Sequence, residues 1–465
     1  MKKKSLFKIL AITMVVVALL TWFIPAGYYQ GEYVASGINR LGILDLCQYL
    51  VLPFFQSMFL EILVFLLAVG IFYGVLSKTG VYKTTLEKIA KKFKKKGTLF
   101  LIVTAAILTV LSSVGGYGLL FFAFIPLLIS IILLMGYDRV TALLVTIGSI
   151  LVGIMGATFA TPYIESVLST LNLTYVSQIY FKIALLVLSF AVLMIFVLKR
   201  VKTKEKSEKY EDKFLGTETS KGKATGLYVV FAVLFVLTIM GCTNWSEAFG
   251  ITIFTKFHEW LMSISIKDFA VFANILGGST VAIGTWSYFQ IAIVLVVASL
   301  VVAKIYKVRL CEGIVEGIKK IIEPSLLAIF AYGVLILIVN SGMFVTLMSY
   351  VLKSLTKFNA LATLVSLVIN IVGSFTHIEL TYVANFYLPY LAGTFTSSTA
   401  AAALNVMTQA IYGLTMFVAP TSLLLVLGLT YLEIPYNEWL KKTWKLVISL
   451  LILVIIIIIA LLLIL

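Results

Sequence analysis

Apolar runs close to 20 residues long recur along the chain, and short polar, basic or glycine-rich segments separate them. A run of this length crosses the hydrocarbon core of a bilayer as a helix. The pattern therefore predicts an all-α, polytopic membrane protein. We expect spans at residues 6–24, 60–76, 140–161, 181–198, 226–240, 289–303, 325–339, 400–419 and 446–465.

Two pairs of shorter apolar arms interrupt this series. Residues 99–111 and 119–134 flank a polar, glycine-rich segment at 112–118, and a similar pair flanks residues 373–379. The arms of the first pair reach about 20–24 Å at the helical rise, which is short of a ~30 Å hydrocarbon core. Their length and their polar tips favour re-entrant hairpins. Two ordinary spans joined by a short loop remain the alternative, because both arrangements return the chain to the same side.

The two halves of the chain carry the same landmarks in the same order, which predicts an internal repeat. From Gly80 to Pro126 is 46 residues, and from Gly342 to Pro389 it is 47. Each half then has a long span that closes on a proline-containing segment, followed by a final apolar helix. The predicted organisation is a first span and outer loop (1–59), repeat 1 (60–199, hairpin about 98–135), a mobile cytoplasmic linker (200–225), linking and scaffold spans (226–324) and repeat 2 (325–465, hairpin about 359–393).

Composition supports the membrane assignment. Hydrophobic residues are 61% of the 465 residues and charged residues only 12%, about half the charged share of a soluble domain. This composition argues against a soluble enzyme. The formal net charge of +16 does not indicate a nucleic-acid partner, because the basic residues gather in loops between the apolar runs.

The basic residues also predict the orientation. Of the 36 lysines and arginines, 30 lie in loops that the predicted spans place on one side. These loops are residues 1–8, 78–97, 136–139, 199–225, 304–323 and 437–445. Cytoplasmic loops are enriched in Lys and Arg, so we expect a multi-pass protein of the cell membrane with a cytoplasmic N-terminus and an outer C-terminus. An amphipathic helix at 82–96 would lie on the inner leaflet of the bilayer.

This orientation makes the two repeats inverted. Inverted-topology repeats with interrupted helices are a hallmark of secondary transporters, because one copy can gate each membrane face around a central site. Four polar interruptions would meet there: residues 112–118, 153–162, 373–379 and 418–422. At a broken helix, free amides attract a carboxylate, while free carbonyls attract Na⁺ or a proton donor.

The candidate substrate- and ion-binding residues are small or hydroxylated side chains at these interruptions. They are Ser112, Ser113, Gly115, Gly116, Thr158, Thr161, Thr376, Thr421 and Ser422. The alternative for any single one is that it allows tight helix packing. Cys47, Cys242 and Cys311 are scattered and show no metal-ligand spacing, so we expect no catalytic residues, no metal centre and no cofactor beyond coupling Na⁺ or H⁺.

His377 and Glu379 complete the candidate site. Ionisable side chains inside a membrane segment are costly and usually functional. Glu379 could bind a cationic group of the substrate or carry a coupling proton, and His377 could titrate near neutral pH. The alternative is that this tip reaches the outer surface, where both side chains would be solvated.

Short motifs along nearly the whole chain carry a family resemblance. They are residues 21–27 (TWFIPAG), 76–80 (LSKTG), 135–138 (MGYD), 419–422 (APTS), 434–436 (IPY) and 439–441 (WLK). In their order and spacing they resemble the ion transporter superfamily, especially its YfcC-like branch. That branch is related to the anaerobic four-carbon dicarboxylate carriers and is similar to arginine/ornithine-type antiporters.

The resemblance implies scaffold and transport modules, re-entrant hairpins, a homodimer and elevator-like movement. It implies uptake or exchange of a small carboxylate or amino acid, driven by Na⁺ or H⁺. Family carriers have a Gly-x-x-Glu-Glu-like stretch at the first hairpin tip, whereas Gly118 is followed by Leu119 and Leu120 here. The second tip reads FTHIE at residues 375–379 instead of a Ser/Gly-rich sequence.

The sequence therefore predicts a secondary active transporter of a small organic anion or amino acid. One alternative is a membrane enzyme or lipid-handling protein that acts on a lipid-linked substrate. It would need a cluster of catalytic acids or metal ligands, and the sequence offers isolated acids. A second alternative is a degenerate carrier that serves as a partner subunit or sensor, because the acidic pair of the family is missing.

Overall fold

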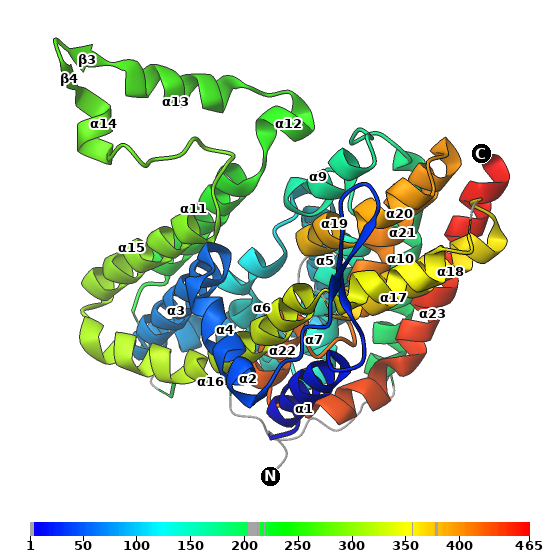
Figure 1. The fold of residues 1–465 in the computed structure, drawn as a ribbon. Helices are drawn as coiled ribbons and strands as arrows, with labels where there is room; N and C mark the ends of the chain where they lie inside the picture. The colour runs from blue at the N-terminus through cyan, green and yellow to red at the C-terminus, as the bar shows by residue number, and fades with distance from the viewer. Residues whose placement is uncertain are drawn as a thin grey trace.

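Helices make up nearly all of the regular structure, as the apolar runs predict (Figure 1). The computed structural model describes residues 4–202, 212, 214–217, 219–220, 222–355, 357–376 and 380–465. The prediction of an all-α polytopic membrane protein is confirmed.

The first half of the chain contains a short hairpin and the elements of repeat 1. Its elements are α1 (Lys4–Leu20), β1 (Ala26–Tyr29), β2 (Tyr33–Gly37), α2 (Ile43–Val51), η1 (Leu52–Phe55), α3 (Ser57–Lys78), α4 (Val81–Phe93), η2 (Lys94–Lys96), α5 (Gly97–Gly115), η3 (Gly118–Ala123), α6 (Ile125–Leu134), α7 (Arg139–Leu143), η4 (Leu144–Gly148), α8 (Ser149–Met155), α9 (Thr161–Thr170) and α10 (Ile179–Lys202).

The second half begins with an arm that projects from the bundle, at the top left of Figure 1. The arm runs from the end of α11 (Thr225–Cys242) to the start of α15 (Tyr288–Tyr306). It contains α12 (Trp245–Phe249), α13 (Ile253–Ser263), β3 (Ser265–Ile266), β4 (Phe269–Ala270) and α14 (Val271–Leu276). The remaining helices are α16 (Leu310–Ser341), α17 (Met343–Leu352), α18 (Ala360–Thr376), α19 (Leu380–Phe386), α20 (Leu388–Thr394), α21 (Ser398–Thr415), α22 (Leu423–Tyr431) and α23 (Tyr436–Ile464).

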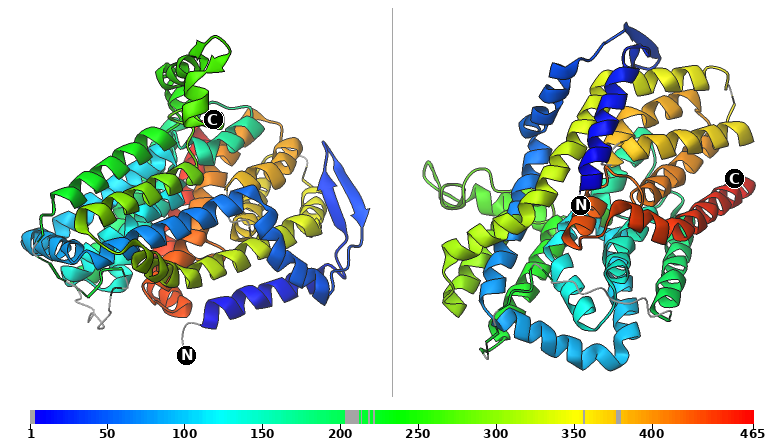
Figure 2. Two further views of the ribbon diagram at one scale, coloured as in Figure 1. Left: turned by 90° about the vertical axis from the view of Figure 1, so that its left-hand side faces the viewer. Right: turned by 90° about the horizontal axis from the view of Figure 1, so that it is seen from below.

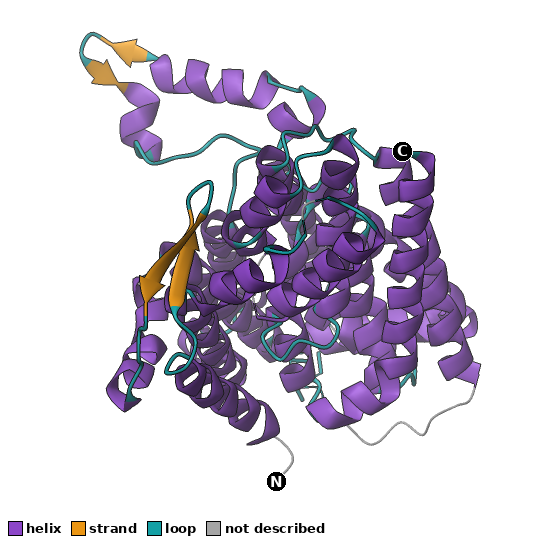
Figure 3. Cartoon of the chain, turned by 45° about the vertical axis from the view of Figure 1, so that its right-hand side comes forward, coloured by secondary structure: helices purple, strands orange, loops and turns teal. Residues whose placement is uncertain are grey.

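The strands form two small antiparallel hairpins, β1 with β2 and β3 with β4 (Figure 3). Across the first hairpin Tyr29 pairs with Tyr33. Gly27, in β1, donates its amide to the Gly342 carbonyl, at 3.2 Å. The hairpin thus ties the N-terminal segment to the start of α17.

Seven helical stretches among the described residues are long and apolar enough to cross a bilayer. They are Ser57–Lys78, Val81–Gly115, Ile179–Lys202, Thr225–Cys242, Tyr288–Tyr306, Leu310–Ser341 and Tyr436–Ile464. Shorter apolar helices, among them α1, α6 and α18, accompany them.

The order of elements from α3 to α10 is repeated from α16 to α23. Each copy has a long helix, a shorter one after a glycine with positive φ, two arms, a broken helix and a final long helix. Counterparts pack on each other: α3 on α16, α8 on α21, and α10 on α23. The views of Figure 2 show α3 (blue) beside α16 (yellow-green). Two copies related by a twofold axis would make these pairings.

The contact between α3 and α16 depends on four glycines. Gly70 and Gly74 on α3, and Gly313 and Gly317 on α16, are each four residues apart. A Cβ on Gly74 would come within 3.0 Å of the Gly313 carbonyl oxygen, and one on Gly317 would come as close to that of Gly70. Small residues at this spacing let helix backbones touch, so the two opening helices of the repeats cross without intervening side chains.

Two predicted boundaries differ from the structure. The first arm of hairpin 1 does not end at residue 111, because α5 continues through Ser112 and Ser113 to Gly115. The two hydroxyls donate to the carbonyls of Ile150 in α8 and Gly156 directly after it, so they do not compete with the α5 backbone. With 19 residues, α5 is about 28 Å long, and the length argument for a re-entrant arm does not hold for this helix. The boundary at 324/325 lies inside α16, which continues through Pro324.

The linker between the repeats is anchored, at least where the structure describes it. Asp212 accepts hydrogen bonds from Ser130 of α6 and, at 2.6 Å, from Tyr431 of α22. Phe214 is 1% exposed and lies between the rings of Tyr73 and Tyr431, at centroid distances of 5.4 and 5.3 Å. A carboxylate and an aromatic ring of the linker therefore contact the bundle, and the mobility of the linker stays a prediction.

Candidate functional site

The first hairpin tip and the first broken helix lie against each other. The Ser113 hydroxyl donates to the Gly156 carbonyl at 2.7 Å and lies 3.3 Å from the Thr158 hydroxyl. The Thr158 amide donates to the Ser113 carbonyl at 2.9 Å. On α8, six residues before Gly156, the Ile150 carbonyl accepts from Ser112 at 3.0 Å. These bonds join the first tip to α8 and to the first break.

Glycine sets the geometry of the first tip. Gly115 ends α5, and Gly116 follows with φ of +65°, a left-handed conformation that glycine adopts at little cost. The amide of Gly116 donates to the Ser112 carbonyl at 3.1 Å. On the other side of the contact, α8 ends at Met155 and Thr161 is the first residue of α9. The chain between them is the first break.

The second tip and the second break meet in the same way. The Thr421 hydroxyl donates to the Phe375 carbonyl at 2.8 Å. Thr376 turns back on its own helix and donates to the Gly373 carbonyl at 2.9 Å. Ser422 caps α22 by accepting the Leu425 amide at 3.4 Å. His377 and Glu379 lie outside the described residues.

A cavity of about 280 Å³ lies where these segments converge. The two predicted site residues on its wall are Gly116, from the first tip, and Ser422, from the second break. Leu119 and Leu120 also line it, where the family pattern has its acidic pair. The other lining residues are Met58, Leu151, Ile154, Cys242, Trp286, Ser287, Tyr288, Leu380, Thr381, Tyr412, Met416, Leu423 and Leu424.

The N-terminus of α22 opens onto this cavity. The first amides of a helix have no partner within the helix, and together they favour an anion. Ser422 occupies the amide of Leu425, while Leu423 and Leu424, which carry the first two amides, line the cavity. The wall is otherwise mostly apolar. An anionic group of a small ligand would find its polar partners at this end.

A buried polar cluster beside the first break was missed by the sequence reasoning. Lys182 of α10 is fully buried, and its ammonium has no hydrogen-bond partner among the described residues. On α21, Asn405, Thr408 and Gln409 are also fully buried, and each has a side-chain oxygen without a partner. The sequence signal was available: a lysine four residues into an apolar helix, and an Asn and a Gln one turn apart in an alanine-rich one.

The described contacts place this cluster next to the break. Gln409 donates to the Ala157 carbonyl at 3.1 Å, and Asn405 donates to the Gln178 side chain at 2.7 Å, at the start of α10. A Cβ on Gly156 would lie within 3.0 Å of Leu186. Leu186 is one helical turn after Lys182, so both lie on one face of α10. Lys182 is therefore on the face of α10 that meets the first break.

A two-repeat helical membrane bundle, with two broken helices around a buried cavity, is the architecture of a membrane transport protein. The chain belongs to the C4-dicarboxylate anaerobic carrier family, whose model matches residues 4–463. The resemblance seen in the sequence is thereby confirmed, and the chain is a transporter by family. No curated protein matches it.

Two solved structures are similar to it over most of their length. The YdaH transporter of Alcanivorax borkumensis is 13% identical, with 97% of each chain covered and a TM-score of 0.45. MtrF of Neisseria gonorrhoeae, one of a class of antimetabolite efflux pumps, is 11% identical, with 97% of this chain and 94% of that one covered and a TM-score of 0.41.

Proposed function

We propose that this protein is a secondary active transporter of a small organic anion, with a C4-dicarboxylate as the first candidate and an amino acid as the second. Transport is driven by a Na⁺ or H⁺ gradient or by exchange. The family name supports the dicarboxylate, and carboxylates are the groups that a helix N-terminus attracts.

The observation that carries the proposal is the cavity between the repeats. Its volume, about 280 Å³, is at the small end of ligand pockets and suits a molecule of a few carbon atoms. The first tip and the second break contribute to it together. A substrate held there, with a carboxylate at Leu423 and Leu424, would contact both repeats, as alternating access requires.

Lys182 supplies a positive charge in the same bundle. An unpaired ammonium inside a membrane protein is costly. An anion that pairs with the Lys182 ammonium during transport would offset this cost. The amide and hydroxyl oxygens of Asn405, Thr408 and Gln409 form no hydrogen bond with the ammonium, which leaves them free to bind a coupling cation. The elevator-like movement and the homodimer that the resemblance implies complete the proposal.

Uptake into proteoliposomes tests it. Labelled C4-dicarboxylates and a panel of amino acids would be offered under imposed Na⁺, pH and substrate gradients. We expect accumulation of at least one C4-dicarboxylate above the level of empty liposomes. Folded protein that transports no member of the panel under any gradient would contradict the proposal.

Two serine caps provide a matched pair of variants. Ser422 caps α22 at the cavity, and Ser397 caps α21 by accepting the Ala400 amide at 3.2 Å. Each Ser→Ala change removes one helix cap, at a cost of about 1 kcal/mol. We expect Ser422→Ala to lower uptake and Ser397→Ala to leave it near the wild-type rate. Equal effects would assign the loss to helix capping and not to the cavity.

A further inference from the structure

A groove between α10 and α23 lies apart from the candidate transport site. It encloses about 810 Å³. On α10 its wall is formed by Val192, Ile195, Phe196, Lys199 and Arg200, and on α23 by Lys441, Lys442, Trp444, Lys445, Leu446 and Ser449. On each helix these residues recur at three- and four-residue spacings, so the groove follows one face of each helix.

The charged residues of the groove gather at one end. Lys199 and Arg200 are in the last turn of α10, and Lys441, Lys442 and Lys445 are near the start of α23. The two helices pack on each other, and both are long enough to cross a membrane. Their basic ends therefore lie at the same level, the one that the loop charges predict to be cytoplasmic.

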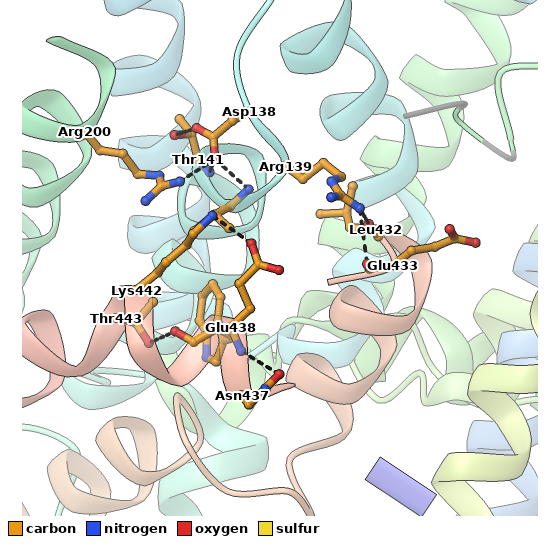
Figure 4. A network of polar contacts seen from close by, with 12 residues as sticks. Asp138, Arg139, Thr141, Arg200, Leu432, Glu433, Asn437, Glu438, Lys442 and Thr443 are labelled. Carbon is orange, nitrogen blue, oxygen red and sulfur yellow. Dashed lines mark hydrogen bonds and ion pairs between the residues drawn. The ribbon is translucent and has the colours of Figure 1, made fainter. Parts of the chain in front are cut away.

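Two of the five cations are neutralised by acidic partners (Figure 4). Arg200 and Asp138 form an ion pair at 2.7 Å, and Lys442 and Glu438 form another at 2.7 Å. Burial raises the pKa of the Asp138 carboxyl, but hydrogen bonds from Arg200 and Thr141 outweigh burial and hold the pKa below its ordinary value. Asp138 is therefore ionised at neutral pH, and Arg200 is committed to it.

The other three cations of the groove are not neutralised by any described acidic side chain. Lys199, Lys441 and Lys445 are exposed and form no ion pair with any described residue. The Lys445 ammonium lies 5.5 Å from the centre of the Trp444 ring, and Trp444 is 52% exposed. Exposed tryptophan next to lysine is typical of the membrane–water interface.

The opposite end of the groove is apolar apart from Ser449. Val192, Ile195 and Phe196 lie one to two turns deeper along α10 than the basic pair, and Leu446 follows Lys445 on α23. Ile195 is 54% exposed. A soluble anion would satisfy the lysines and leave this apolar floor uncovered, whereas a phospholipid has an anionic headgroup and acyl chains in the same arrangement.

We propose that the groove between α10 and α23 binds an anionic phospholipid, with its phosphate at Lys199, Lys441 and Lys445 and an acyl chain along Ile195 and Phe196. Basic pockets between membrane helices at the cytoplasmic side bind such headgroups. Because α10 and α23 end the two repeats and pack on each other, the lipid fastens the repeats together at one membrane face. The site does not depend on the identity of the transported substrate.

Lipid-dependent thermal stabilisation of the purified full-length protein tests the proposal. Phosphatidylglycerol and phosphatidylcholine with the same acyl chains would be titrated into the detergent-solubilised protein, with inorganic phosphate as a third arm. We expect phosphatidylglycerol to raise the melting midpoint and to remain bound in native mass spectra, and neither effect with phosphatidylcholine or phosphate.

Two triple variants remove the same charge at different places. In the groove, Lys199→Gln, Lys441→Gln and Lys445→Gln should weaken phosphatidylglycerol binding on the order of 100-fold, since each lysine near a headgroup strengthens binding about fivefold. Outside the predicted inner face, Lys256→Gln, Lys267→Gln and Lys353→Gln change exposed lysines and should leave binding nearly unchanged.

Three results would overturn the proposal. Equal losses in the two triple variants would indicate general surface attraction. A shift with phosphate alone would indicate a soluble anion, and an equal shift with phosphatidylcholine would make the lysines irrelevant. The midpoint of the groove variant in phosphatidylcholine controls for folding. None of these results would bear on substrate transport, which the uptake assay measures separately.

Discussion

Lys182 is a basic residue at a fully buried position. Its ammonium is fully buried and has no partner among the described residues, so replacing it should relieve a cost and not create one. We expect Lys182→Met to keep or raise the melting midpoint. Uptake should fall about 10- to 100-fold, the effect of one hydrogen bond to a charged group.

The control for this prediction is Lys202→Met, which changes an exposed lysine at the end of the same helix. It should alter neither midpoint nor uptake. If Lys182→Met transported at the wild-type rate with unchanged substrate affinity, Lys182 would have no role as the counter-charge of the substrate. A Lys182→Arg variant with partial uptake would support a need for positive charge at this position.

Asp212 gives a prediction for the pH dependence of stability. Burial raises the pKa of its carboxyl, although hydrogen bonds from Ser130, Tyr431 and the Phe214 amide and the charge of Lys320 oppose this. The folded protein therefore holds this proton more tightly than the unfolded chain does. The stabilisation is fully present below the ordinary pKa of 3.8 and is lost as pH rises through the raised pKa.

Melting midpoints measured across this pH window check the sign. We expect the stability advantage of the wild type over Asp212→Asn to shrink as pH rises above 3.8, because Asp138, with its lowered pKa, contributes equally to both proteins. Asp268→Asn, at an exposed position of the projecting arm, should retain the wild-type slope. A profile that is unchanged in Asp212→Asn would show that the linker carboxylate does not titrate in this window.

At this scale the sequence predicted some residues and missed others for physical reasons. The sequence places Ser113, Thr158 and Thr421 at helix breaks because polar residues interrupt apolar runs there, and their role in a site stays a prediction. Lys182 was missed because it sits near the edge of an apolar run, where a lysine usually reaches water. Only the packing of α8 against α10 and the hydrogen bond from Asn405 of α21 to Gln178 show that this one is enclosed.

Among the elements, the apolar runs predicted where most helices lie but not always where they end. Runs of apolar residues record burial, whereas a helix continues for as long as its backbone bonds are satisfied. Ser112 and Ser113 look like a break, yet their hydroxyls donate to carbonyls in and directly after α8, and α5 continues to Gly115. Pro324 likewise suggests a boundary, and α16 passes through it.

The crossing of α3 and α16 predicts a large difference between two glycine substitutions. A Cβ on Gly317 would lie within 3.0 Å of the Gly70 carbonyl oxygen, whereas a Cβ on Gly278 would meet nothing within 4 Å. Gly317→Ala must push the two helices apart, at a cost of about 1–3 kcal/mol for overpacking. We expect its melting midpoint to fall by several degrees and that of Gly278→Ala to stay within about one degree. A similar midpoint for both variants would contradict the close crossing.

For the whole molecule, the membrane orientation can be tested with its own three cysteines. Cys47 and Cys311 are exposed, and Cys242 is buried. The charge of the loops predicts that Cys47, in the segment before α3, faces outside and that Cys311, at the start of α16, faces the cytoplasm. A membrane-impermeant maleimide applied to intact cells should therefore label Cys47 and leave Cys311 unmodified.

Labelling before and after the membrane is opened separates the two positions. Cys47→Ser should abolish the labelling of intact cells, and Cys311→Ser should abolish the additional labelling that appears after permeabilisation. Cys242 should stay unlabelled in both, since it is 5% exposed. Labelling of Cys311 in intact cells would reverse the assignment of the 30 basic residues to the inner face. The two repeats would still be inverted relative to each other, but the lipid groove between α10 and α23 would then face outside.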